Sequence, residues 1–442
     1  MNNRLIVTFS LLLIFVSQSL FSQEEDTLLY RYRRIAVEYQ QQVKMARHSL
    51  EGAESKLKAA KSGYGPKLDF SGNYSYYGVP LQLAPPADEP LGTPGDELHN
   101  MYSLDLTLSQ PVLTGGYLKN TKLAAESEVE AMKNYVKLSE QEVMFQADQV
   151  YLNTVAKKEI NRLSQAYRDI VGQFVKVIND KVEEEVVGKN ELYQAKVRFN
   201  DAQYQVLRST KQYEMSLMNL NRLMGFPMDS VPFVADSLTA LKKVVVPDDL
   251  INTALTNRPE FGYLQGKVMA SQYREKVTIS KYNPQFGLLA GGKWGSPSPG
   301  LQLDPDFNYY FKAQLNIPIY YWGQKRKEAH AVKQVTEIAK LKIDQTKDAV
   351  ILEAQQSYFN LVKSQEQMEF AASALENAKN NVSVMLDRYN EGLSSVLEVL
   401  DAQTFWQKSY FNYIQAKYDM NLAYSEYLKA LGELVKENNN KK

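Results

Sequence analysis

The sequence contains no cysteine. This absence excludes thiol catalysis, zinc sites built from thiolates, disulfide bonds and the lipid-modified cysteine of a lipoprotein. Histidine is nearly absent too. Only His48, His99 and His330 are present, and they lie in unrelated segments. No glycine-rich loop that could cradle a phosphate is found. We therefore expect no catalytic residues, no metal site and no cofactor.

Neither sign of charge is in excess. The 51 basic and 51 acidic residues give a formal net charge of zero. A neutral chain offers no electrostatic argument for binding nucleic acid, so nucleic acid is not an expected partner.

Long apolar runs are missing, apart from one near the N-terminus. Residues 5–16 follow Arg4 and are apolar, but they are too few to span a bilayer as a helix. Small residues at Ser19 and Ser22 suit cleavage after them. We predict a cleaved signal peptide over residues 1–22 and an exported protein without a transmembrane helix. A retained anchor helix is the alternative.

Proline and glycine are both absent between Gly323 and Glu391. A helix over these roughly 70 residues would be about 100 Å long, many times the usual length of about three turns. After a turn at residues 390–393, a return helix is predicted, with apolar residues at heptad spacing broken only by Gln403 and Lys417. Helices of this length and pattern pack lengthwise against other helices, as in a bundle or a tube.

Four segments of about ten residues alternate apolar and polar side chains, a pattern typical of strands with one apolar face. In the second segment, for example, Leu104 and Leu106 alternate with Asp105 and Thr107. Proline is expected to end the second and fourth strands. The predicted strands lie at about 67–78, 101–111, 285–294 and 307–317.

The chain is an internal duplication. Pro111 recurs as Pro318 and Gly116 as Gly323 at one constant spacing, which also separates Gly225 from Gly432, and repeats of this size decide a fold. Single helices are expected over 27–62 and 248–281. The first predicted repeat covers 23–225, with long helices at about 116–182 and 189–224. A linker over 226–247 leads to the second repeat over 248–434, with long helices at about 323–390 and 394–431. A flexible tail is predicted over 435–442.

The strand pattern suits a membrane. Strands of about ten residues with an apolar outer face and a polar inner face are typical of bilayer-spanning barrels. An open sheet cannot stand in lipid, because each unpaired backbone group costs several kcal/mol there, and four strands are too few to close a barrel around a channel. Aromatic residues near the strand ends, such as Trp294 and Trp322, suit the interfacial girdles of such barrels. The pattern therefore predicts an oligomeric barrel, with a soluble β-sandwich as the alternative.

Two stretches resemble motifs of a known family. Gln110–Gly116, QPVLTGG, looks like a strand-to-helix junction of the TolC-like outer-membrane efflux proteins. Tyr389–Ala402, YNEGLSSVLEVLDA, resembles the periplasmic tip of that family. The ordered, duplicated set of strand pairs and long helical hairpins resembles the family over the whole mature chain.

The resemblance implies a mainly α fold with a transmembrane β-barrel part. Three copies would form a twelve-stranded barrel in the lipid of the outer membrane, continued by a helical tunnel in the periplasm. The tunnel would dock on a periplasmic adaptor protein and an inner-membrane pump. Pro111, Gly116, Pro318 and Gly323 would form the strand-to-helix junctions.

By position in the resemblance, Glu398 and Asp401 correspond to an acidic pore constriction. Tyr389, Asn190 and Glu191 correspond to polar links that hold the aperture closed. Read from the sequence alone, Glu398 and Asp401 share one helix face, and threefold symmetry would make each a ring of carboxylates that selects cations. Crowding would raise some of their pKa values above about 4. The alternative is a solvated acidic turn.

The tip also departs from the family pattern. The family's linking arginine falls on Ser394, and its first-repeat tip glycine falls on Glu185, three residues before Gly188. Adaptor docking is expected at Gly188 and at Gly392 with Leu393. The expected latch is a hydrogen bond from Tyr389 to Glu191.

The function that the sequence predicts best is the outer-membrane channel of a tripartite efflux or type I secretion system. The alternatives are a periplasm-spanning coiled-coil protein without a pore and, less favoured, an enzyme. Drug, metal and protein export share this outer component, so the sequence does not specify the cargo.

Overall fold

The computed structural model describes residues 28–82, 97–239, 249–297 and 304–435. The chain divides into two compact units. The first contains Met1–His48, Asn134–Gly262 and Asp344–Lys442, and the second contains Ser49–Lys133 and Tyr263–Ile343. Each unit thus takes segments from both predicted repeats. The predicted signal peptide and nearly all of the predicted tail lie outside the described residues.

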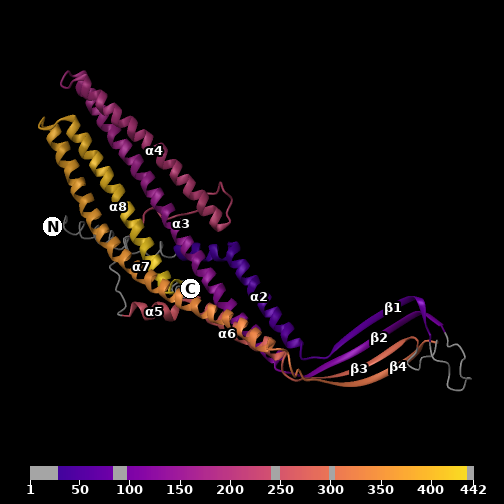
Figure 1. Cartoon of the computed structure of the whole chain (residues 1–442). Coiled ribbons are helices and arrows are strands. Elements are labelled where there is room, and N and C mark those ends of the chain that lie inside the picture. The colour runs from indigo at the N-terminus through magenta and orange to yellow at the C-terminus, as the bar shows by residue number, and fades with distance from the viewer. Residues whose placement is uncertain (1–27, 83–96, 240–248, 298–303, 436–442) are drawn as a thin grey trace, which may run out of the picture. The chain divides into compact units, whose positions relative to one another are not determined.

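A four-stranded antiparallel sheet forms in the second unit, with the strand order β1-β2-β3-β4 (Figure 1). The strands are β1 Lys67–Gln82, β2 Glu97–Thr114, β3 Gln285–Ser296 and β4 Asp306–Asn316. All four predicted strands are present, and β1 and β2 are longer than expected. Strands β1 and β4 are the two edges of this sheet.

The strand register places the apolar residues of all four strands on one face. Phe70 lies opposite Leu106, Leu106 opposite Gly292, and Gly292 opposite Tyr309. Cross-strand neighbours share a face, so the alternating patterns combine into one apolar surface. Phe70 and Tyr309 are both exposed, as expected for side chains whose surroundings are lipid rather than a protein core.

Pro111 does not end its strand, contrary to the sequence-based prediction. Strand β2 continues to Thr114, and the register with β3 shifts between Pro111 and Leu113. A proline has no N–H to donate, so within sheets it is found at edges and bulges, and the extra residue Val112 supplies such an irregularity. Pro318 does follow the end of β4 at Asn316.

The two longest helices are α3 Tyr117–Glu183 and α7 Gln324–Asn390, each with 67 residues. Their return helices are α4 Lys189–Met224 and α8 Val396–Ala430. These bounds agree closely with the predicted hairpins. Among the described residues, no helix is both long and apolar enough to cross a membrane.

Two helices that were predicted as continuous are broken. The first breaks at Gln40, before α2 Gln41–Ser62, where the Gln40 side-chain amide donates to the Leu223 carbonyl at 2.6 Å. The second divides into α5 Leu250–Asn257 and α6 Pro259–Ser280. Pro259 explains that break, because a proline disfavours helical backbone in the residue before it but suits the first position of a new helix.

The two polar residues that interrupt the heptad pattern of α8 are buried in the protein and not exposed to solvent. Gln403 and Lys417 are both buried. The Lys417 ammonium contacts the Glu159 carboxylate of α3 at 2.7 Å, and both side chains are almost fully buried. The same lysine donates to the hydroxyl of Ser237, and the other Glu159 oxygen accepts the backbone N–H of Leu238. This ion pair thus holds the described part of the predicted linker against α3 and α8.

Candidate functional site

The candidate site lies at the turns of the two long hairpins, which are found at the same end of the first unit (Figure 1). One apolar cluster joins all four helices there, and its members include Phe174 of α3, Leu192 of α4, Tyr389 of α7 and Val399 of α8. Both hairpins therefore end on a shared core. The turns themselves are exposed above this core.

The turn between α7 and α8 follows a Schellman motif. Gly392 has a φ of +76°, and its N–H donates to the Tyr389 carbonyl at 3.1 Å. The Leu393 N–H donates to the Arg388 carbonyl at 2.7 Å. These bonds satisfy helix carbonyls that would otherwise have no partner. Leu393 consequently points its apolar side chain away from the core and is 62% exposed.

The turn between α3 and α4 has the same geometry without a glycine. Glu185 has a φ of +59°, and its N–H donates to the Val182 carbonyl at 3.2 Å. The Val186 N–H donates to the Lys181 carbonyl at 2.9 Å. Glu185 and Val186 are therefore the structural counterparts of Gly392 and Leu393. Val186 is 68% exposed.

Gly188 lies three residues after the left-handed position of this turn, which Glu185 occupies as the sequence predicts. It is the N-cap of α4, with extended backbone at φ −76° and ψ 149°. The backbone counterpart of Gly392 is therefore Glu185 rather than Gly188. The conformation of Gly392 is taken here by Glu185, since a left-handed residue is required at this point of the motif whatever its side chain.

Tyr389 does not make the predicted hydrogen bond to Glu191. Its hydroxyl is buried and has no hydrogen-bond partner among the described residues. The ring packs edge-on against Phe174 with centroids 5.2 Å apart, and the Lys181 ammonium lies 4.2 Å from its centroid. Burial raises the pKa of the Tyr389 hydroxyl, and the nearby Glu191 charge adds to the shift. Tyr389 therefore links α7 to α3 by packing and a cation–π contact.

Asn190 and Glu191 lie in the first turn of α4. Asn190 is exposed, while Glu191 is half-buried. A carboxylate in the first turn interacts favourably with the positive end of a helix. Glu191 is thus placed to stabilise α4, and its charge reaches Tyr389 without a direct hydrogen bond.

Glu398 forms a capping box with Ser395 at the start of α8. Its carboxylate accepts the Ser395 backbone N–H at 2.7 Å, and the Ser395 hydroxyl accepts the Glu398 N–H at 3.3 Å. These bonds to Ser395 lower the pKa of Glu398. Within one chain the shift is thus opposite to the rise expected from crowding. The Ser-x-x-Glu spacing is a known capping signature, so the sequence did contain this signal.

Asp401 pairs with Arg198, a residue that was not expected at this site from the sequence. The Arg198 guanidinium of α4 contacts the Asp401 carboxylate of α8 at 3.1 Å, and both side chains are half-exposed. The two residues are far apart along the chain, so periodicity could not have paired them. Ser394, which stands where the family has an arginine, donates to the Met385 carbonyl at 3.1 Å inside the turn.

The strand-to-helix junctions have left-handed backbone at two successive residues. Gly116 has a φ of +92° and Gly323 of +76°. The residue before each is also left-handed, with a φ of +61° at Gly115 and +47° at Trp322. The Thr114 hydroxyl accepts the backbone N–H of Leu118 at 3.3 Å. Glycine suits such positions because it has no Cβ.

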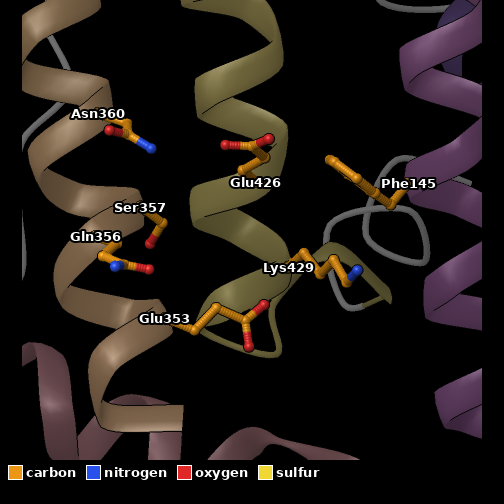
Figure 2. A pocket seen from close by; sticks show the side chains of 7 residues that line it. All are labelled: Phe145, Glu353, Gln356, Ser357, Asn360, Glu426 and Lys429. Atoms are coloured by element: carbon orange, nitrogen blue, oxygen red, sulfur yellow. The ribbon is translucent and has the colours of Figure 1, made fainter. Parts of the chain in front are cut away.

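A polar cavity of about 220 Å³ lies between α3, α7 and α8, away from the tip (Figure 2). Glu426 faces it, and burial raises the pKa of this carboxyl, while Lys429 opposes the shift and Glu353 adds to it. The other side chains that line it are Phe145, Gln356, Ser357 and Asn360. None of the predicted site residues lies in this cavity.

The sequence and fold match known proteins. A model of the outer membrane efflux protein family matches residues 34–226 and 250–433. The outer membrane efflux protein BepC of Brucella suis is 21% identical over 85% of this chain and 79% of its own length. The toluene efflux pump outer membrane protein TtgI of Pseudomonas putida is 20% identical over 86% of this chain and 79% of its own.

The fold is also found among solved structures. The CmeC outer membrane channel of Campylobacter jejuni superposes with a TM-score of 0.76 at 19% identity, over 93% of this chain and 89% of that one. The family match extends over both repeats and includes both hairpin tips. The chain belongs to the outer membrane efflux protein family.

Proposed function

We propose that three copies of this chain form a closed duct that carries efflux cargo across the outer membrane. The observation that carries the proposal is the open sheet. Strands β1 and β4 are edges, while one face of the sheet is apolar. Unpaired edge groups cost several kcal/mol each in lipid, and pairing β4 of one copy with β1 of the next removes every edge.

Exposed apolar side chains on the long helices support self-association. Tyr204 and Leu207 of α4 and Ile338 and Leu341 of α7 are each more than half exposed. Isolated apolar residues on a surface are ordinary, but repeated ones along an element favour an interface. We propose that these helices pack against neighbouring copies and form a tunnel wall that continues the barrel.

The hairpin tips are the proposed docking points for a periplasmic adaptor protein, which in turn engages an inner-membrane pump. Val186 and Leu393 present one exposed apolar side chain at equivalent places of the two tips. Three copies would therefore present a ring of six such side chains. This proposal replaces Gly188 by Val186 as the docking residue of the first repeat.

Glu398 and Asp401 remain the proposed pore constriction. Rings of carboxylates in a pore select cations and repel anions. In this proposal the Arg198 contact to Asp401 and the packing of Tyr389 hold the tip together, in place of the hydrogen bond expected from the sequence. The family arginine replaced by Ser394 is not needed for that role.

The cargo is set by the pump that delivers it. TtgI is the outer membrane protein of a toluene efflux pump, and a duct lined by polar side chains can serve cargo of many kinds. We propose no single cargo for this chain.

The oligomeric state of the full chain, extracted from outer membranes in mild detergent, tests the proposal. The mass of the protein after correction for detergent should equal that of three chains, and boiling should release the monomer. A monomer that salt alone removes from the membrane would contradict both the barrel and the duct.

A further inference from the structure

Trp322 is a large apolar side chain of the second unit that packs against little of its own chain. It is 86% exposed, and its backbone is left-handed at a φ of +47°, where a residue with a bulky side chain is a rare outlier. The ring contacts Tyr320 at a centroid distance of 5.1 Å. Trp322 lies shortly after the end of β4, which is an edge of the sheet. It therefore lies where a neighbouring copy would meet this chain.

The first repeat has Gly115 at the equivalent place. A Cβ built on Gly115 would lie 2.7 Å from the Asn283 Cβ and 2.7 Å from the Ser280 carbonyl oxygen. The Asn283 side-chain amide donates to the Gly115 carbonyl at 2.8 Å. Gly115 of the first repeat is thus covered by Asn283, which lies just before β3 in the second repeat.

The entry segments of the two strand pairs correspond as well. Ser62, Tyr64 and Pro66 recur as Ser280, Tyr282 and Pro284, at a spacing wider than that of Pro111 and Pro318, because the stretch between β1 and β2 is longer than that between β3 and β4. The Gly65 N–H donates to Ser62 and the Asn283 N–H to Ser280, at 3.0 and 3.1 Å. The counterpart of Asn283 is therefore Gly65. The small and the large residue are exchanged between the two places. In the observed contact, Gly115 meets Asn283. In the equivalent contact, Trp322 stands in place of Gly115 and Gly65 in place of Asn283.

The repeat also preserves strand register. Lys67 lies opposite Ser109 in the first hairpin, and their counterparts Gln285 and Asn316 lie opposite each other in the second. The pairing of β2 with β3 is the one contact between repeats in this sheet. Its counterpart would pair β4 with β1 of another copy.

We infer that β4 of one copy pairs with β1 of the next in the register of β2 with β3, and that Trp322 packs over Gly65 of the partner subunit. Leu108 lies opposite Ala290 in the observed pair. Their counterparts place Leu315 opposite Gly72 of the partner subunit. The inference rests on the proposed trimer and adds the register and the residues of its seam.

The inferred register pairs residues that lie on the same face of the sheet and whose side chains fit each other in size. Leu315 and Gly72 lie on the apolar faces of their strands, as the observed pairings of each strand require. On the other face, the same register brings Lys312 opposite Ser75 of the partner subunit, two polar positions. The large side chain of Leu315 meets a glycine, just as Leu106 meets Gly292 within the chain.

Cysteine pairs test the register directly, since the chain has no cysteine of its own. We expect L315C/G72C to give disulfide-linked dimers and trimers when the assembled protein is oxidised. The in-chain counterpart L108C/A290C is the positive control and should form a disulfide without linking chains. The pair L315C/F70C, shifted by two residues on the same face, should link chains at least tenfold less.

The outcomes separate the register from the trimer. Stronger linking by the shifted pair in a protein of trimeric mass would overturn the register and leave the trimer intact. A trimer in which L315C/G72C forms no interchain bond, although L108C/A290C closes, would overturn the register too. A monomeric mass together with no linking by either interchain pair would contradict the proposed trimer itself.

Fluorescence tests the contact of Trp322. The chain has three tryptophans, so the variant W294F/W406F leaves Trp322 as the only one. We expect acrylamide to quench Trp322 several-fold less in the assembled protein than in detergent-dissociated chains. Introducing G65N into the same background should raise quenching in the assembled state. Equal quenching before and after dissociation would overturn the placement of Trp322 over Gly65.

Discussion

Single residues at the hairpin tips are held by backbone geometry, packing and one ion pair. Glu398 caps its own helix, and Tyr389 is anchored by Phe174 and Lys181. The Arg198–Asp401 pair is the charged contact between α4 and α8 at this end. At the residue scale, the tip therefore depends on contacts that motif comparison did not identify.

Removing the Arg198 guanidinium should loosen the tip. We expect Arg198→Ala to raise single-channel conductance, because Asp401 loses its partner and carboxylate repulsion across the pore is no longer offset. Lys196→Ala on the exposed face of the same helix is the matched control and should leave conductance unchanged. Tyr389→Phe should also have little effect, because the hydroxyl that it removes makes no hydrogen bond with the described residues. A rise with Tyr389→Phe and none with Arg198→Ala would reverse this assignment.

The half-buried carboxyl of Glu426 should make stability depend on pH. Its pKa is raised in the folded chain by burial, so the folded state loses stability as pH rises from the unfolded value of about 4.3 through the folded pKa. We expect Glu426→Gln to raise the melting temperature at pH 7 and to have no effect below about pH 4. Glu376→Gln, at an exposed position of α7, is the control. An equal effect of Glu426→Gln at both pH values would contradict the role of its charge.

At the scale of elements, alternation and helix length predicted most of the fold. The strands and long hairpins follow from period-two patterns and from runs without proline or glycine. The break at Gln40 and the continuation of β2 past Pro111 could not be predicted, because each depends on a distant partner: the Leu223 carbonyl and the neighbouring strand β3. The Arg198–Asp401 pair was missed for the same reason, whereas the capping box at Ser395 was readable.

The continuity of α7 is testable. Ala354 is fully buried in the cluster shared by α5, α7 and α8. Proline there should cost about 3 kcal/mol or more by breaking the helix, and Ala354→Pro should abolish assembly. Lys189→Pro changes the first residue of α4, where proline is tolerated. Normal assembly of Ala354→Pro, measured by the mass of the extracted protein, would show that the segment is not helix interior.

The buried pair of Lys417 and Glu159 should be costly to break. Lys417→Met leaves a buried carboxylate without its cation, which typically costs about 3–5 kcal/mol. The free energy of unfolding in denaturant measures the loss. The double variant Lys417→Met with Glu159→Leu should recover most of it, because apolar replacement of a whole buried pair is often neutral. A double variant no more stable than the single one would show that the charge is not the cause.

At the scale of the whole molecule, the faces of the sheet determine how the outer-membrane protein meets lipid. Leu106→Arg on the apolar face should weaken insertion by about 2–4 kcal/mol if the site is near the bilayer midplane. Ser103→Arg, on the opposite face of the same strand, should be tolerated. The amount of heat-modifiable trimer in outer-membrane fractions measures the effect of each substitution. Equal damage by the two variants would mean that the faces are assigned the wrong way round.

We expect assembled copies of this chain to enclose a conducting pore with an acidic constriction. Single-channel recording of the purified full-length protein in a planar bilayer tests it most directly. We expect discrete, cation-selective openings that trivalent cations block. The block should disappear in the Glu398→Ala, Asp401→Ala variant while the trimer remains intact. A trimer that inserts but never conducts would contradict the duct, and unchanged block in the double variant would contradict the constriction.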